Sequence, residues 1–147
     1  MCQIADVRRV VLDSSVVISG FRSQRGASYK LLDFIAGRQL VLLATPALFL
    51  EYEDVLKRPE QRAVSGLTLA QVDAALAALA AAVEPVEVHF AWRLQLADPD
   101  DEMVLEAAVN GQADALIMHN LADFVQAAPR FGLAVLRPGE LLERMKR

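Results

Sequence analysis

The sequence has little cysteine, since Cys2 is the only one among 147 residues. A single thiol cannot form a disulfide within the chain, which favours a reducing compartment. The first residues lack the basic start and the apolar segment of a secretory signal. Uncharged stretches such as 40–50 and 74–83 are shorter than the roughly 18 apolar residues that a membrane-spanning helix needs. We therefore expect a cytoplasmic protein.

Several well-known catalytic patterns are also missing. The chain has no Ser-His-Asp spacing, no glycine-rich phosphate loop and no Cys/His zinc pattern. Its net charge of -4 argues against a broad basic surface for nucleic acid, but it allows acidic groups that bind cations. With 54% apolar and 23% charged residues and no low-complexity tract, the composition predicts one globular domain over 1–147.

Short apolar runs alternate with amphipathic segments along the chain. The runs are too short for helices and predict buried strands over 7–12, 40–44, 115–118 and 133–136. Caps, prolines and apolar spacing predict helices over 27–36, 46–57, 69–83 and 99–109, a short helix from 120 to 128, and a terminal helix from Pro138. A loop is expected over 20–26 and an extended segment over 86–90. Alternation of this kind predicts an α/β fold, with a parallel sheet covered by helices on both faces.

Carboxylates follow the ends of these strands. Asp13 closes the apolar run 10–12, and Asn120 and Asp123 lie just past the strand 115–118. A carboxylate at the end of a buried strand is costly unless something pairs with it, and several converging carboxylates are suited to a divalent cation. In open parallel sheets the ligand crevice lies beyond the carboxyl ends of the strands. A metal-dependent site is therefore the first hypothesis.

Helical spacing selects among the other acids. In the segment 46–57, Glu51 and Glu53 both flank the apolar stripe, whereas Asp54 points away from it, so spacing alone does not separate the two glutamates. In the segment 99–109, Asp101 lies one turn before Val104 on the same apolar face of the helix. Asp101 serves there either as a metal ligand or as a helix cap.

Asp123 has a similar alternative role. Asn120 followed three residues later by Asp123 is similar to a capping box, which is a purely structural arrangement. We interpret His119, at the end of a strand, as a hydrogen-bonded structural residue rather than a general base.

Four of these segments resemble the motifs of PIN domains in their order and spacing. They are Asp13-Ser14-Ser15-Val16, Thr45-Pro46 leading to Glu51, Asp98-Pro99-Asp100-Asp101 leading to Leu105 and Ala108, and His119-Asn120 leading to Asp123-Phe124. The resemblance runs from about Val10 to Leu141 and is greatest to the toxin components of bacterial toxin-antitoxin pairs, the VapC-type ribonucleases. No single motif is specific to PIN domains, but the four motifs in this order are.

The resemblance implies a parallel sheet flanked by helices and an Mg²⁺- or Mn²⁺-dependent ribonuclease. It makes Asp13, Glu51, Asp101 and Asp123 the metal-binding catalytic acids, and it selects Glu51 over Glu53. Ser14 and Asn120 would be supporting residues. It also implies an RNA substrate, a cognate antitoxin protein and a homo-oligomer as partners.

The chain departs from the PIN pattern at three positions. Ser15 stands where asparagine is usual, Met118 where threonine or serine is common, and Asn120 where many relatives have aspartate. These departures suggest a catalytically weakened PIN domain that binds RNA or protein as the main alternative to a nuclease. A third hypothesis is a hydrolase of small phosphoesters, because carboxylate and Mg²⁺ chemistry does not itself specify the substrate.

Overall fold

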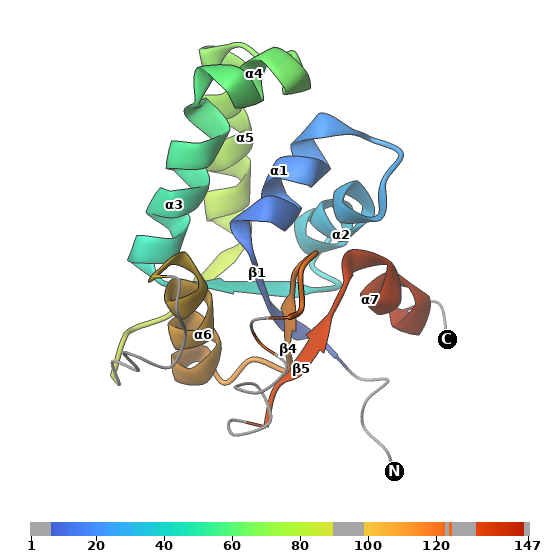
Figure 1. Ribbon diagram of the computed structural model, residues 1–147, viewed down its shortest axis with the longest axis vertical. Helices are drawn as coiled ribbons and strands as arrows, with labels where there is room; N and C mark the ends of the chain where they lie inside the picture. Colours follow the sequence, from blue (N-terminus) through green and yellow to red (C-terminus); the bar gives the residue numbers. More distant parts are fainter. Residues whose placement is uncertain (1–6, 90–98, 123, 125–131, 146–147) are drawn as a thin grey trace.

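Five parallel strands form one sheet at the centre of the protein (Figure 1). The computed structural model describes residues 7–89, 99–122, 124 and 132–145. The strands are β1 (Arg9–Leu12), β2 (Val41–Ala44), β3 (Val83–Pro85), β4 (Ala115–Ile117) and β5 (Ala134–Leu136). Their order in the sheet is β3-β2-β1-β4-β5, and every neighbouring pair is parallel. The predicted α/β class is confirmed, and the ends of the four predicted strands differ from the prediction by one or two residues.

Helices cover the sheet in a three-layer arrangement. They are α1 (Ser14–Arg22), α2 (Ala27–Ala36), α3 (Pro46–Lys57), α4 (Pro59–Ser65), α5 (Leu69–Ala82), α6 (Pro99–Gly111) and α7 (Pro138–Met145). In Figure 1, α1 and α2 lie above β2 and α6 lies below it. The α6 helix contacts β1, β2 and β4, whereas α2 contacts α1, α5 and α7.

The helix start signals act as the sequence predicts. The Thr45 hydroxyl accepts a hydrogen bond from the Leu48 amide at 3.1 Å, and Pro46 is the first helical residue of α3. Thr68 and Gln71 form a reciprocal capping box at the start of α5. These side chains satisfy amide groups that have no partner within the helix.

The predicted loop over 20–26 is wrong at its beginning, because α1 continues to Arg22. Gly20 lies inside this helix for a packing reason. A Cβ atom there would come within 2.4 Å of Leu32 Cδ1, so the glycine permits close approach of α1 and α2. Glycine usually weakens a helix, and tertiary packing overrides that preference here.

The edge strand also differs from the prediction. Val83 was expected in the helix and 86–90 as the extended segment, but α5 ends at Ala82 and the strand is Val83–Pro85. Val83 pairs with Leu42 of β2, so Val83 belongs to the sheet and does not extend α5. Proline is tolerated at this position because β3 is an edge strand. Phe90 lies outside the described residues, as does most of the helix expected over 120–128.

The core lies on both faces of the sheet. Val10, Val11 and Leu12 of the central strand are fully buried, and they pack with apolar residues of β2, β4 and the helices. Within the described residues no single helix is long and apolar enough to cross a membrane. Helices α4 and α5 pass such a test only as a pair, and they are bent by 87° at the break between them.

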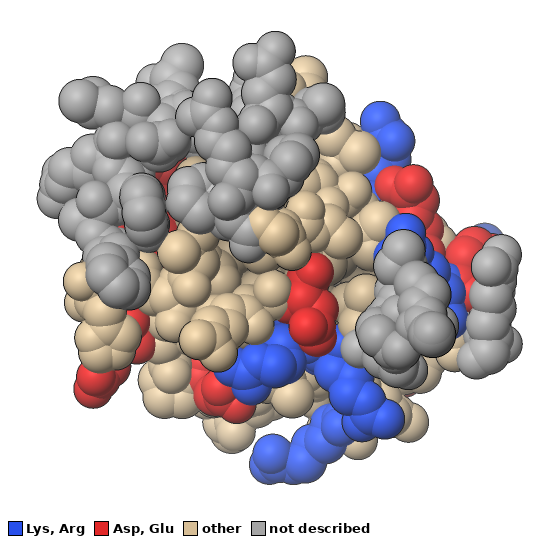
Figure 2. Space-filling view, turned by 90° about the horizontal axis from the view of Figure 1, so that it is seen from below, with Lys and Arg blue, Asp and Glu red and all other residues tan. Residues whose placement is uncertain are grey.

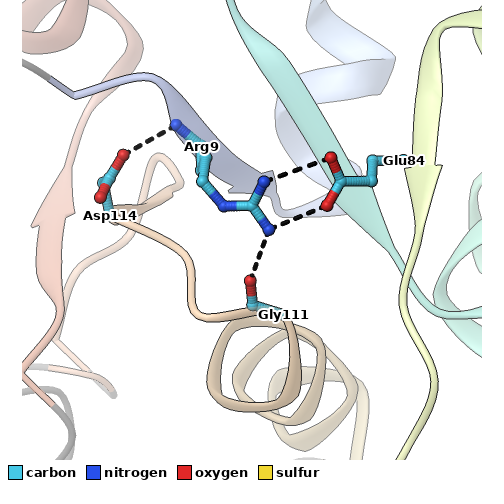
Figure 3. A network of polar contacts seen from close by, with 4 residues as sticks. All are labelled: Arg9, Glu84, Gly111 and Asp114. Atoms are coloured by element: carbon cyan, nitrogen blue, oxygen red, sulfur yellow. Dashed lines mark hydrogen bonds and ion pairs between the residues drawn. The ribbon is translucent and has the colours of Figure 1, made fainter.

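An ion pair joins strands β1 and β3 near the amino end of β1 (Figure 3). The Arg9 guanidinium donates to both carboxylate oxygens of Glu84, across the intervening β2, and to the Gly111 carbonyl at 2.9 Å. The Arg9 amide donates to Asp114 at 2.9 Å. A cation at the last carbonyls of α6 also complements the helix dipole. This network fixes the end of α6 that lies away from Asp101.

Charges of both signs are mixed on one face of the protein. On the face shown in Figure 2, Lys and Arg side chains lie beside Asp and Glu side chains.

Candidate functional site

Asp13 lies at the carboxyl end of β1, the central strand of the sheet. It is the N-cap of α1, and its carboxylate accepts hydrogen bonds from the Ser15 amide at 3.3 Å and from the Ser15 hydroxyl. The Asp13 amide donates to the Ile117 carbonyl of β4 at 2.9 Å. The side chains of Asp13 and Ser14 are partly buried. Asp13 is thus held at the edge where ligands of parallel sheets bind.

Tyr52 brings α3 to this same strand end. Its hydroxyl donates a hydrogen bond to the carbonyl of Leu12, the residue before Asp13, and its side chain is fully buried. Burial, and then the charge of Asp13, raise the pKa of the Tyr52 phenol well above its ordinary value. The phenol therefore stays a neutral donor. Because Glu51 precedes Tyr52 in α3, this bond fixes the helical turn that bears Glu51 against the end of β1.

The other two acids of α3 have different surroundings. Glu53 pairs with Lys57 at 2.7 Å, and Lys57 also pairs with Asp73 of α5 at 2.9 Å. Asp54 is exposed and pairs with Arg58 at 2.7 Å. Glu53 is thus held in an ion pair within α3, by a lysine that also pairs with α5, and the choice of Glu51 over Glu53 stays a prediction.

Asp101 lies in the first turn of α6. Its side chain is partly buried, and Val104, Leu105 and Ala108 of the same helical stripe are buried in the core. Helix α6 contacts α3, β1 and β2, and its last residue, Gly111, lies beside Arg9 at the amino end of β1, so its first turn lies toward the opposite, carboxyl end of the sheet.

The segment after β4 is described only in part. The Asn120 side chain is exposed, and its oxygen accepts a hydrogen bond from the Ala122 amide at 3.1 Å. His119 Nε2 lies 3.0 Å from the Ser19 hydroxyl oxygen, which agrees with a hydrogen-bonded structural role. Asp123, the fourth predicted acid, lies outside the described residues.

The chemistry of this donor set fits a hard divalent cation. Carboxylate oxygens are the ligands that Mg²⁺ and Mn²⁺ prefer, and Asp13, Glu51 and Asp101 lie on elements that pack together. Among the described residues, however, no three His, Cys, Asp or Glu side chains form a group that could hold a metal ion. The four-acid site stays a prediction.

Replacing Tyr52 by phenylalanine should lower the free energy of unfolding by about 1–3 kcal/mol, because a buried hydrogen bond to the Leu12 carbonyl is lost. Denaturant unfolding at pH 7 measures this change. The raised phenol pKa also predicts that the native chain loses stability as pH rises above about 10, where the unfolded chain ionises. The phenylalanine variant should lack this contribution.

Tyr29 provides the matched control, since it is the only other tyrosine and is 37% exposed. The Tyr29→Phe variant should change the stability by less than about 0.5 kcal/mol. Equal losses in the two variants would contradict the role given to the Tyr52 hydroxyl.

Comparison with protein families identifies the domain. The model of the PIN domain family matches residues 9–122. The chain belongs to the PIN domain family. The matched region contains Asp13, Glu51, Asp101 and Asn120 and ends one residue before Asp123. PIN domains are generally nucleases, and they usually bind divalent metal ions. The comparison with curated proteins gives no match.

Two departures from the PIN pattern can be placed in the structure. Ser15 donates to the Asp13 carboxylate through both its amide and its hydroxyl, so serine orients this acid without the usual asparagine. Met118 is only 2% exposed and lies in the core. Sequence reasoning did not foresee the roles of Ser15 and Tyr52. Tyr52 lies on the apolar stripe of its helix, and no sequence signal shows where its hydroxyl points.

Proposed function

We propose that this PIN domain is a metal-dependent endoribonuclease and the toxin of a toxin-antitoxin pair. The observation that carries the proposal is the placement of Asp13 at the end of the central strand, with the α3 turn bearing Glu51 fixed beside it by the bond between Tyr52 and Leu12. Asp13, Glu51, Asp101 and Asp123 would hold Mg²⁺ or Mn²⁺. Ser14 and Asn120 would support them.

The bound ion would activate a water molecule and neutralise the charge that builds on the phosphate. The protein side chains would orient the substrate and hold the ligands in place. The orientation of Asp13 by Ser15 supports an active nuclease over the main alternative, a weakened PIN domain that only binds RNA or protein.

The direct test compares three substrates for the purified chain. Labelled single-stranded RNA, DNA of the same sequence and a small aryl phosphoester should be incubated with Mg²⁺, with Mn²⁺ and with a chelator. We expect cleavage of RNA alone, and only when a divalent ion is present. RNA binding without cleavage would favour the binding module, and turnover of the aryl phosphoester would favour the small-molecule hydrolase.

The toxin assignment predicts a growth defect. Expression of the chain alone in bacteria should slow growth, and co-expression of a small partner encoded beside it should relieve the defect, because an antitoxin would block the acidic site with a basic side chain. Growth curves at matched expression measure this. The Asp13→Asn variant is the control and should be harmless. Normal growth with abundant soluble native chain would contradict the toxin role.

We also propose that the chain associates with copies of itself. Helix α5 presents small residues outward, and Ala75, Ala78 and Ala82 line an apolar groove of about 210 Å³ between α2 and α5, together with Phe21 and Tyr29. Small side chains permit close approach of a second subunit, and this supports a homo-oligomer.

A further inference from the structure

A second hollow lies outside the group of predicted acids, between α1, α2 and α7. It has a volume of about 560 Å³, which is within the range of small-ligand sites. Small or apolar residues form part of its wall, and polar side chains from all three helices and from two strand ends form the rest. The lining residues include Ser19, Ser28, His119, Arg137, Gly139 and Glu140.

This hollow lies along the same edge of the sheet as Asp13. His119 follows the carboxyl end of β4, and Arg137 follows that of β5. Since β1, β4 and β5 are neighbours, these ends are spaced by about 5 Å each. Ser19 lies six residues after Asp13, on the same helix, or about 9 Å along its axis. A nucleotide next to a phosphodiester held at Asp13 would therefore reach the hollow.

The polar groups of the hollow include both hydrogen-bond donors and acceptors. The Ser19 hydroxyl oxygen lies 3.0 Å from His119 Nε2 and 2.7 Å from the hydroxyl of the buried Ser28, which orients the exposed imidazole. The Arg137 guanidinium is largely exposed and lies 4.0 Å from the carboxylate of Glu140. Imidazole and guanidinium planes are both groups on which RNA bases stack.

The carboxylate of Glu140 distinguishes between two possible ligands of the hollow, a phosphate and a nucleobase. A phosphate offers only acceptors and a negative charge, so Glu140 would repel it. A nucleobase has a flat apolar face and an edge that carries both donors and acceptors, so it can use His119, Arg137 and Glu140 together. The hollow therefore favours a base over a phosphate.

We infer that this hollow binds a nucleobase of single-stranded RNA beside the phosphodiester that is cleaved, with His119 and Arg137 contacting the base. The inference rests on the proposed ribonuclease function and adds to it a residue set that would determine sequence preference. His119 and Arg137 would thus bind substrate although neither is one of the predicted metal-binding acids.

The two histidines of the chain allow a direct measurement. His119 lies in the hollow, whereas His89 follows β3 and its amide donates to Asn110 of α6. The imidazole proton signals can be assigned with a His89→Gln variant. At constant pH and without divalent ions, each of the four ribonucleoside monophosphates should be titrated into the protein, with inorganic phosphate and ribose 5-phosphate as controls.

We expect the His119 signal to shift saturably with at least one nucleotide, with no shift for either control and none for His89. Equal shifts with ribose 5-phosphate would overturn the inference in favour of an anion site, and the absence of any His119 shift would also overturn it. This readout does not depend on cleavage. A His119 shift in a protein that never cleaves RNA would overturn the nuclease proposal and leave base binding intact.

A blocking variant tests the hollow itself. A Cβ atom at Gly139 meets no atom within 4 Å, so Gly139→Phe can enter the hollow without a clash at its base. It should weaken nucleotide binding roughly 5- to 100-fold, the range for loss of one stacked base, and change the cleavage preference. Ala80→Phe, on an exposed position of α5, is the matched control and should bind normally. Unchanged binding by a folded Gly139→Phe variant would contradict the inference.

Discussion

Replacement of Asp13 by asparagine should reduce RNA cleavage by about a hundredfold or more while the fold stays intact. The loss is expected because the change removes a charge from the predicted metal site at the end of β1. The fold should survive because asparagine caps helices as well as aspartate does, and it can still accept the hydrogen bond from the Ser15 amide. Single-turnover cleavage of labelled RNA measures the activity, and thermal unfolding measures the fold.

Asp54→Asn is the matched control for this change. Asp54 is an exposed acid whose ion pair with Arg58 lies on the outer side of α3, so its replacement should leave cleavage unchanged. Asp101→Asn should behave as Asp13→Asn does. Wild-type turnover by a purified Asp13→Asn or Asp101→Asn variant would remove that residue from the site.

The parallel sheet could be predicted because four of its five strands contain continuous apolar runs, a pattern that arises when both faces are buried. Helix starts at Thr45, Thr68 and Pro138 were equally predictable, because capping is local chemistry between residues a few positions apart. The errors arose where a distant contact decides the structure. Gly20 predicts a loop, but it lies in a helix because Leu32 packs against it. Val83 fits the helical pattern of the preceding residues, but it lies in a strand because it pairs with Leu42.

The site shows the same division between local and distant causes. Asp13 could be recognised from its position after an apolar run, but the choice between Glu51 and Glu53 could not be made from helical spacing. Lys57 holds Glu53 through a contact that also involves Asp73, a residue distant along the chain, and the choice of Glu51 stays a prediction. The hydrogen bond from Tyr52 to Leu12 spans 40 positions, and no local pattern predicts it.

Addition of Mg²⁺ or Mn²⁺ should raise the melting temperature of the protein near neutral pH. An ion that binds only the folded chain stabilises it by RT ln(1 + [L]/Kd), which is about 2.7 kcal/mol at a hundredfold excess over Kd. For a chain of this length the shift should be roughly 5–10 °C. It should shrink as pH falls toward about 4, where protons compete with the ion for carboxylates. Differential scanning calorimetry at several ion concentrations measures both effects.

The comparison of Asp101→Asn with Asp54→Asn tests whether the helical faces were assigned correctly. Asp101 is partly buried in the first turn of α6, on the stripe that packs into the core, so its loss should remove most of the ion-induced shift. The Asp54 side chain is 64% exposed and its surface ion pair contributes about 0–1 kcal/mol, so its loss should leave the shift unchanged. Both variants keep the size of the side chain, and any difference between them reports the ion rather than packing. Equal ion responses in the two variants would show that Asp101 is not a ligand and that its carboxylate only caps α6.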